Sequence, residues 1–328
     1  MLHPRVAARW AGGAVLCLQQ CGVSGGGELV AGRLVDWEVG GEREIKVCCA
    51  TFYQSDLVRL LLGEVFHPGG LALTSHLGER LGLGPGDRVL DVACGRGVAA
   101  VHLAERFGCH VTGLDYGPQN IAAAEALAAG KGLSSRTAFR QGDAEGLPFG
   151  DASFDAVLSE CSFCTFPDKA KAAAEQYRIL VPGGRLGLTD MTLDGDLPDD
   201  ALCESLLAWV ACVAGAGPPD EYVATLQAAG FADLAVEDRR ADLLEMVADV
   251  RRKLLGVELA AGLGKLDLGD LDLAEGKRLA RRALELIEGG VVGYTLITAR
   301  KTKISPARAG SQSGAQARIM IRAEQRVG

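Results

Sequence analysis

Residues 89–97 combine a carboxylate with two closely spaced glycines at the end of an apolar run. The segment reads Val-Leu-Asp-Val-Ala-Cys-Gly-Arg-Gly, so Asp91 precedes Gly95 and Gly97. Glycine permits a tight turn and lets backbone N–H groups approach a ligand closely. Residues 98–107 are predicted to form a helix, whose N-terminus carries partial positive charge. A strand, a glycine turn and a helix in this order are typical of a nucleotide-type site.

Three carboxylates limit the kinds of ligand that this turn could bind. Asp91 suits a ligand with a positive ammonium group and is awkward beside a pyrophosphate. Asp115 follows the glycines by about 20 residues, the spacing of a carboxylate that binds ribose hydroxyls. Asp143 could accept a hydrogen bond from an adenine amine, or it could simply cap a turn. The glycines together with Ala100 also satisfy the dinucleotide pattern G-x-G-x-x-A, so glycines alone do not distinguish the cofactor.

An alternation of apolar strands and amphipathic helices from residue 88 to residue 190 must position these side chains. The predicted strands are 88–93, 110–115, 137–141, 154–159 and 185–189, and the predicted helices between them are 98–107, 118–129 and 168–180. This alternation predicts a parallel, doubly wound α/β sheet. The ligand crevice of such a sheet lies at the carboxyl ends of its strands.

The motifs in this order resemble those of class I S-adenosylmethionine-dependent methyltransferases. They are the glycine turn, Gly-Leu-Asp, Gly-Asp-Ala-Glu-Gly-Leu-Pro-Phe, Phe-Asp-Ala-Val and Leu-Val-Pro-Gly-Gly-Arg-Leu, all between residues 88 and 190. The resemblance implies a Rossmann-like, mostly parallel seven-stranded sheet whose antiparallel last strand would be 294–299. It also implies a helical N-terminal lid and a C-terminal helical insert.

The same resemblance implies S-adenosylmethionine as the cofactor and gives roles to individual residues. Asp91 and Gly95 would lie near the methionyl part, Asp115 at the ribose, and Asp143 with Ala144 at the adenine. The cofactor-binding residues expected on this basis are Asp91, Ala93, Gly95, Gly97, Asp115, Tyr116, Asp143, Ala144 and Glu160.

A thiol-rich segment, Ser-Glu-Cys-Ser-Phe-Cys at 159–164, follows the fourth predicted strand, where an acceptor should meet the methyl group. Its order with Pro-Asp-Lys and Leu-Val-Pro-Gly-Gly-Arg-Leu resembles arsenite methyltransferases, and the context of Cys212 is similar to that family's second metalloid-binding region. By this resemblance Cys161 and Cys212 would hold trivalent arsenic, a soft species that prefers thiolate sulfur. Cys48 and Cys49 could add thiols from a lid over the cofactor.

Glu160 completes the expected catalytic set of Cys161, Cys212, Cys48 and Cys49. Its carboxylate could orient an acceptor or act as a general base. Alternative interpretations remain open at this point. Cys161 and Cys164 could form half of a zinc site or a redox pair, or simply be buried. His67, before Pro-Gly-Gly, could close the site or cap a turn, and the turn is the favoured interpretation.

The acceptor is likewise open on sequence alone. Transfer to a thiol-bound metalloid, most readily arsenite, is the leading hypothesis. The alternative is C- or O-methylation of a small organic acceptor such as a quinone, sterol or natural product. A non-catalytic protein that senses or sequesters metal ions, and a dehydrogenase, are further possibilities.

Composition sets the remaining expectations. The chain has 328 residues and a net charge of −8, which argues against general nucleic-acid binding. Its ten cysteines are expected to be reduced thiols in the cytoplasm, or in an organelle if the N-terminal extension is a transit peptide. No apolar run is long enough to span a bilayer. A monomer is expected, and a thiol reductant is a candidate partner.

Four segments are expected along the chain. They are a poorly ordered N-terminal extension (1–45), the cofactor-binding core with lid helices at 52–63 and 71–81 (46–195), a helical cap that completes the sheet (196–300), and a disordered basic tail (301–328). Within the cap we expect helices at 199–213, 220–229, 243–255 and 271–287, and a strand at 234–238.

Overall fold

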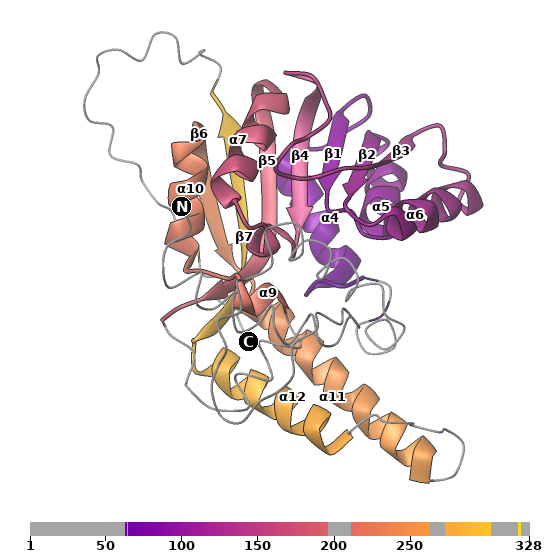
Figure 1. Cartoon of the computed structure of the whole chain (residues 1–328), viewed down its shortest axis with the longest axis vertical. Coiled ribbons are helices and arrows are strands. Elements are labelled where there is room, and N and C mark those ends of the chain that lie inside the picture. The colour runs from indigo at the N-terminus through magenta and orange to yellow at the C-terminus, as the bar shows by residue number, and fades with distance from the viewer. Residues whose placement is uncertain (1–62, 64, 196–210, 263–272, 303–320, 323–328) are drawn as a thin grey trace, which may run out of the picture.

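The computed structural model describes residues 63, 65–195, 211–262, 273–302 and 321–322, which form one sheet with helices packed around it (Figure 1). The sheet order is β3-β2-β1-β4-β5-β7-β6-β8. The strands are β1 (Arg88–Val92), β2 (His110–Asp115), β3 (Thr137–Gln141), β4 (Phe154–Glu160), β5 (Leu180–Leu193), β6 (Phe231–Asp238), β7 (Val292–Lys301) and β8 (Ile321–Arg322).

The predicted sheet is confirmed, including its antiparallel strand. Strands β1 to β5 pair in parallel, and β7 pairs antiparallel to both β5 and β6. The two-residue strand β8 adds to the seven expected and pairs parallel with β6. It lies in the segment 301–328, for which no regular structure is expected from sequence.

The sheet is doubly wound because successive strands of the chain are added outward from the centre, first on one side and then on the other. The connection from β1 to β2 moves one way along the sheet and that from β4 to β5 moves the other way. Right-handed crossovers therefore put their helices on opposite faces. Helices α4 (Gly70–Leu81), α5 (Val98–Phe107) and α6 (Pro118–Gly130) pack side by side, and α7 (Lys169–Ile179) packs with α10 (Pro219–Ala228) (Figure 1).

Strand β5 is longer than the sequence indicates. Residues 181–184 are expected as a turn and 185–189 as a strand, whereas β5 runs unbroken over 14 residues. Its pairing with β4 shifts register between Phe154 and Ala156, and Gly183 takes a left-handed φ of 80°. The Pro-Gly-Gly segment is thus accommodated as an irregularity within the strand instead of ending it.

The insert between β6 and β7 consists of α11 (Arg240–Gly262) and α12 (Leu273–Glu288), which pack against each other and extend away from the sheet (Figure 1). Both helices are predicted from sequence, although α11 extends beyond the predicted 243–255. Because β6 runs parallel to β4 and β5, this insert begins at the carboxyl edge of the sheet. The short elements η1 (Phe163–Thr165) and α9 (Ala211–Ala214) lie at the same edge.

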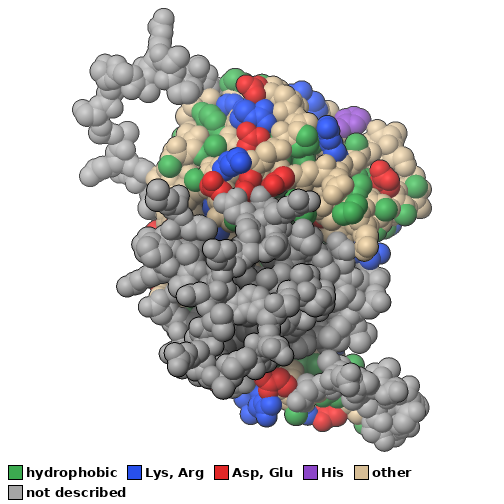
Figure 2. Space-filling view, in the orientation of Figure 1, with side chains coloured by type: hydrophobic (Ala, Val, Ile, Leu, Met, Phe, Trp, Pro, Cys, Tyr) green, Lys and Arg blue, Asp and Glu red, His purple; other side chains and the backbone are tan. Residues whose placement is uncertain are grey.

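The central strands are buried on both faces, as expected of a parallel sheet covered by two helix layers. Val89, Leu90 and Val92 of β1 are fully buried. On the surface shown in Figure 2, acidic and basic side chains are interspersed over the described part of the sheet domain. None of the described helices is both long enough and apolar enough to cross a membrane. The predicted helices at 52–63 and most of 199–213 lie outside the described residues.

Candidate active site

One cavity lies at the carboxyl ends of β1, β2 and β4 and beside the segment that follows β3. Eight of the nine expected cofactor-binding residues line it, together with Cys161; those eight are Asp91, Ala93, Gly95, Asp115, Tyr116, Asp143, Ala144 and Glu160. The parallel register explains this convergence, because Asp91 pairs with Gly113 of β2 and with Leu158 of β4. The strand ends therefore meet at one edge of the sheet.

Gly97 is expected in the cofactor site but does not line the cavity. It caps the N-terminus of α5 with a left-handed φ of 76°. A Cβ at this position would lie 2.6 Å from Cβ of Ala124 and 2.8 Å from the Phe139 ring. The second glycine of the turn therefore serves the close packing of helix on sheet.

Asp91 has the electrostatics of a site for a cation. Its side chain is 2% exposed, and its Oδ2 atom has no hydrogen-bond partner among the described residues. Burial, followed by the negative charges of Glu160 and Asp115, raises the pKa of Asp91 well above its usual value. An unpartnered buried carboxylate oxygen is costly unless a donor meets it. The ammonium group of S-adenosylmethionine is a donor of the right charge.

Asp115 is held by three donors from the glycine turn and from α6. Its Oδ2 accepts from Gly95 N at 2.9 Å, and its Oδ1 accepts from Gly117 N at 2.8 Å and Asn120 Nδ2 at 3.0 Å. A carboxylate has about four lone-pair sites, so one remains for a ribose hydroxyl. Burial raises the pKa of Asp115 despite these hydrogen bonds. The residue both fixes the turn and faces the cavity.

Asp143 caps a turn and also lines the cavity. Its Oδ1 accepts from Glu145 N at 2.9 Å, which caps the turn that also pairs Asp143 with Gly146. The same residue and Ala144 line the cavity, on the side where adenine is expected. A turn-capping role and a binding role are therefore compatible at this position.

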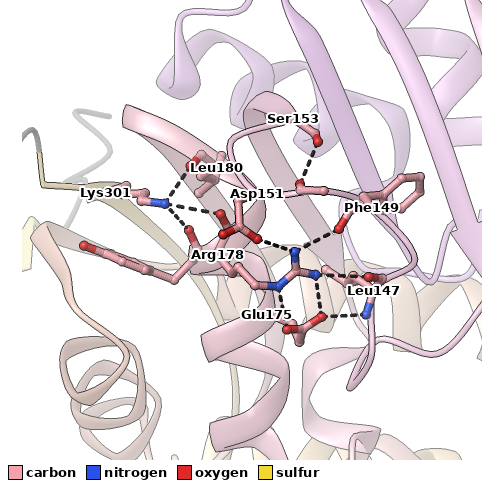
Figure 3. Close-up of polar contacts among 10 residues, drawn as sticks. Leu147, Phe149, Asp151, Ser153, Glu175, Arg178, Leu180 and Lys301 are labelled. Carbon is pink, nitrogen blue, oxygen red and sulfur yellow. Dashed lines mark hydrogen bonds and ion pairs between the residues drawn. The ribbon is translucent and has the colours of Figure 1, made fainter. Parts of the chain in front are cut away.

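Arg178 fixes the segment that follows this turn (Figure 3). Its Nε donates to Glu175 Oε1 at 2.8 Å, and its Nη2 to Glu175 Oε2 at 2.8 Å and Leu147 O at 3.1 Å. Its Nη1 donates to Phe149 O and to Asp151 Oδ1, both at 2.8 Å. Glu175 Oε2 also accepts from Leu147 N at 2.8 Å. All five guanidinium hydrogens are thus directed to partners, four of them within α7 and the segment 147–149.

This cluster is not among the residues expected from the sequence, although the spacing of Glu175 and Arg178 carries a signal. Glu175 and Arg178 are three residues apart on a predicted helix, a spacing that places them on one face. Lys301 of β7 further holds the end of α7 through the carbonyl oxygens of Tyr177, Arg178 and Leu180, at 2.8, 3.3 and 2.7 Å (Figure 3). These carbonyls lack intrahelical partners, so a lysine there stabilises the helix end.

Glu160 lies at the end of β4 and has two polar neighbours from the segment before β1. Its side chain is 4% exposed. Thr74 Oγ1 lies 3.0 Å from Oε2 and 3.2 Å from Oε1, and His67 Nε2 lies 3.6 Å from Oε2. Burial raises the pKa of Glu160, while His67 and Thr74 oppose that rise. His67 also closes a turn through its backbone, as expected, since Gly70 N donates to His67 O at 3.2 Å.

Three thiols gather behind the end of β4. Cys161 Sγ lies 3.8 Å from Cys212 Sγ, and Cys161 takes a left-handed φ of 52°. The hydrogen bond with Cys212, together with burial, raises the pKa of Cys161 well above its usual value. Burial and the neighbouring Cys212 do the same for Cys164. These groups are therefore protonated thiols at neutral pH.

Only one of these three thiols reaches the cavity. Cys161 lines it, whereas Cys164 is fully buried and Cys212 is 2% exposed. Among the described residues, no three His, Cys, Asp or Glu side chains are grouped so as to hold a metal ion. Asp190 lies behind the thiols, where burial raises its pKa to about 7. The expected ligands Cys48 and Cys49 lie outside the described residues.

Comparisons with known proteins agree with this geometry. The family model "Methyltransferase domain" matches residues 83–230. The chain is 32% identical to 27-O-demethylrifamycin SV methyltransferase of Amycolatopsis mediterranei over 266 residues, which cover 75% of this chain and 93% of that protein. It is also 32% identical to arsenite methyltransferase of Halobacterium salinarum, over 49% of this chain and 42% of that protein.

The fold likewise matches solved structures. Phosphoethanolamine N-methyltransferase 2 of Haemonchus contortus, in complex with S-adenosylmethionine, superposes with a TM-score of 0.67 at 21% identity, covering 79% of this chain and 60% of that one. The unpartnered oxygen of Asp91, the oriented carboxylate of Asp115 and the turn at Asp143 fit the same cofactor. The protein is therefore an enzyme that uses S-adenosylmethionine, and the chain belongs to the class I S-adenosylmethionine-dependent methyltransferases.

Proposed function

We propose that this enzyme transfers the methyl group of S-adenosylmethionine to a small organic acceptor. The observation that carries the proposal is the composition of the cavity wall beyond Asp91. This wall contains two polar side chains, Glu160 and His67, and two aromatic ones, Phe66 and Phe166. Of the three thiols behind the end of β4, Cys161 is the one that lines the cavity. Such a wall can surround an apolar molecule and contact one polar group of it.

The relatives support an organic acceptor over arsenite, which is the leading hypothesis from the sequence. At equal identity, the alignment with the rifamycin methyltransferase spans three quarters of this chain, whereas that with the arsenite methyltransferase spans about half. The cofactor half of the fold is shared by methyltransferases of many substrates. The longer alignment also includes the part of the chain outside the cofactor half, so it is the better guide to the class of acceptor.

The residues of the chain hold the cofactor by its charged and polar ends. When bound, S-adenosylmethionine supplies an electrophilic methyl group on a sulfonium. Asp91 would bind the ammonium group, Asp115 the ribose hydroxyls, and Asp143 with Ala144 the adenine. Buried carboxylates favour the cationic cofactor, but its charge is lost during transfer, so they contribute to binding more than to rate. The rate would come from holding acceptor and methyl group in line.

The experiment is transfer of a labelled methyl group to a panel of alcohols, phenols, catechols, enols, amines and arsenite, with mass spectrometry of the products. The panel includes catechol and 4-nitrocatechol. Calorimetry with S-adenosylhomocysteine establishes that the cofactor site of the purified protein is intact. A methylated organic product supports the proposal. Intact binding with no organic product, or with methylated arsenic alone, contradicts it.

Arsenite is the second candidate, and one distance favours it. Cys161 Sγ and Cys212 Sγ lie 3.8 Å apart, close enough for both sulfurs to contact one soft, thiol-seeking atom. If arsenite is the acceptor, Cys161→Ser should abolish arsenite-dependent turnover while binding of S-adenosylhomocysteine survives. Thiol titration should also show arsenite protecting Cys161 and Cys212 from alkylation. Unprotected cysteines would rule this candidate out.

A reducing compartment such as the cytoplasm is part of the proposal. The five cysteines that the structure describes are free thiols. Proteins in the cytosol keep their thiols reduced, whereas secreted proteins generally oxidise them.

A further inference from the structure

Glu160, His67 and Thr74 form a buried polar group beside the cavity, and Glu160 and His67 line its wall. Glu160 ends β4, and the residue two positions before it, Leu158, pairs with Asp91. Glu160 therefore lies further along the carboxyl edge than the carboxylate expected to bind the cofactor's ammonium. His67 and Glu160 both line the cavity. This is the place where an acceptor would approach the methyl group.

The contacts of His67 favour a hydrogen on Nδ1. Nδ1 lies 3.1 Å from the carbonyl oxygen of Pro68, which can only accept, so Nδ1 carries a hydrogen. Nε2 faces Glu160 Oε2 at 3.6 Å and Thr74 Oγ1 at 3.3 Å. A bare Nε2 lone pair beside an ionised carboxylate would be repulsive. The pair is therefore favourable when one more proton is shared between Nε2 and the carboxyl group.

Some groups around Glu160 favour its ionised form, and others oppose it. Thr74 of α4 and His67 favour the ionised carboxylate, whereas burial opposes it. Asp91 of β1 faces Glu160 as a second acid, and Tyr294 of β7 lies within range of its charge. A cationic cofactor would add positive charge next to Asp91. The loaded site thus favours an ionised Glu160, which is a carboxylate able to take up a proton.

We propose that Glu160 accepts the proton that the acceptor loses as it is methylated, and that His67 is a positioning residue that keeps this carboxylate ionised and aimed. The inference rests on the proposed function and narrows it to acceptors with an ionisable hydroxyl. In the transfer step the acceptor's O–H bond breaks and its proton moves to Glu160. An O–C bond forms, and the C–S bond breaks with its electron pair remaining on sulfur. No oxidant or reductant is needed.

The test compares Glu160→Gln on two acceptors that differ in acidity. Catechol keeps its hydroxyl protons at neutral pH and needs a base, whereas 4-nitrocatechol is largely ionised and does not. Loss of a general base costs about 10²- to 10⁴-fold in rate. We expect a loss of that size on catechol and a loss below about tenfold on 4-nitrocatechol. Gln can still accept from Thr74, and thermal unfolding of the variant measures any loss of stability separately from the loss of rate.

His67→Gln supplies a readout that a purely structural role would not move. Without the neighbouring imidazole, the acidic limb of kcat/KM for catechol should shift to higher pH, and the rate should recover in alkaline buffer. Glu125→Gln, on the exposed face of α6, is the matched control and should leave both rates and the pH profile unchanged. Binding of S-adenosylhomocysteine should change less than about threefold in all three variants, a difference under 1 kcal/mol.

Several outcomes separate this inference from the proposed function. Equal losses on both catechols, or a parallel loss of S-adenosylhomocysteine binding, would make Glu160 a cofactor ligand and overturn the inference alone. An unshifted pH profile in His67→Gln would remove the role of His67. Methylation of amines but of no hydroxyl compound would overturn the inference while leaving the organic acceptor in place. Absence of any methylated organic product overturns the proposed function and the inference with it.

Discussion

Glu160 of β4 and Asp91 of the neighbouring strand β1 are two buried acids that share one cavity. Burial, and then the charge of Glu160, raises the pKa of Asp91 well above its usual value, and burial also raises that of Glu160. Ionising two carboxyl groups so close together costs electrostatic free energy unless a cation lies between or beside them. The sulfonium and ammonium groups of the cofactor provide such charge.

The affinity for S-adenosylmethionine should therefore rise with pH. Because both pKa values are raised, the acids hold protons at a pH where ordinary carboxyls have lost them, and the cationic cofactor must displace those protons. We expect Kd to fall as pH rises above the range in which ordinary carboxyl groups ionise, with proton release on binding. Calorimetry in buffers of different ionisation enthalpy measures both quantities. S-adenosylhomocysteine, which lacks the sulfonium charge, is the control and should vary less; a flat Kd for S-adenosylmethionine would contradict the prediction.

Asp91→Asn should weaken cofactor binding and at the same time stabilise the free protein. The loss of a charge-assisted hydrogen bond to the ammonium costs about 1.5–3 kcal/mol, or roughly 10- to 150-fold in Kd. The free protein gains because the variant no longer buries an unpartnered carboxylate oxygen. Calorimetry and thermal unfolding without ligand measure the two effects. A variant that loses affinity and Tm together would show that Asp91 is mainly structural.

Arg178→Lys should raise the KM for S-adenosylmethionine more than the KM for the acceptor. Lysine cannot reach Glu175, Leu147, Phe149 and Asp151 together, so the segment after Asp143 would lose its fixed position. A loss of about 1–3 kcal/mol in unfolding free energy should accompany the change.

Arg106→Lys is the matched control for Arg178→Lys. Arg106 forms a surface ion pair with Glu79, and such exposed pairs contribute little to stability. Urea unfolding and steady-state kinetics with each substrate varied in turn compare the two variants. Equal effects of Arg178→Lys on both KM values would indicate a general loosening of the fold instead of a displaced adenine segment.

Asp190 should make the folded state less stable as pH rises. Its pKa is about 7 in the folded protein, against an ordinary value near 3.8 when unfolded. Between these values the folded protein keeps a proton that the unfolded chain releases, so the unfolding free energy falls from about pH 4 to pH 7 and is level above that. Asp190→Asn should remove the contribution of Asp190 and leave those of Asp91, Asp115 and Glu160. Urea unfolding at several pH values checks the prediction, and equal slopes in the two proteins would refute it.

Much of the site follows from the sequence because its parts are local. Strand, turn and helix in residues 88–107 are set by apolar periodicity and by glycine, and a parallel sheet necessarily brings its carboxyl ends to one edge. The pattern along the chain therefore suffices to predict that Asp91, Asp115, Asp143 and Glu160 lie together. Gly97 is the exception, because its neighbours Ala124 and Phe139 are decided by packing.

Other relationships depend on residues far apart in the chain. Arg178 meets Leu147 across 31 positions, Thr74 meets Glu160 across 86, and Cys161 meets Cys212 across 51. Periodicity says which face of an element is buried, but not which side chains of another element it will meet. The limits of β5 differ from the predicted ones for a similar reason, since its pairing with β4 and β7 continues the strand through Pro-Gly-Gly.

The sequence by itself determined the sheet and the position of the crevice, because these depend on local pattern and on the geometry common to all parallel sheets. The class of cofactor came from the ordered motifs that resemble class I methyltransferases. Only the tertiary structure decided which groups line the cavity. It placed Cys164 and Cys212 behind the cavity wall and His67 with Glu160 in it. Exposure to a cavity is a property of how whole elements pack, and no spacing along the chain specifies it.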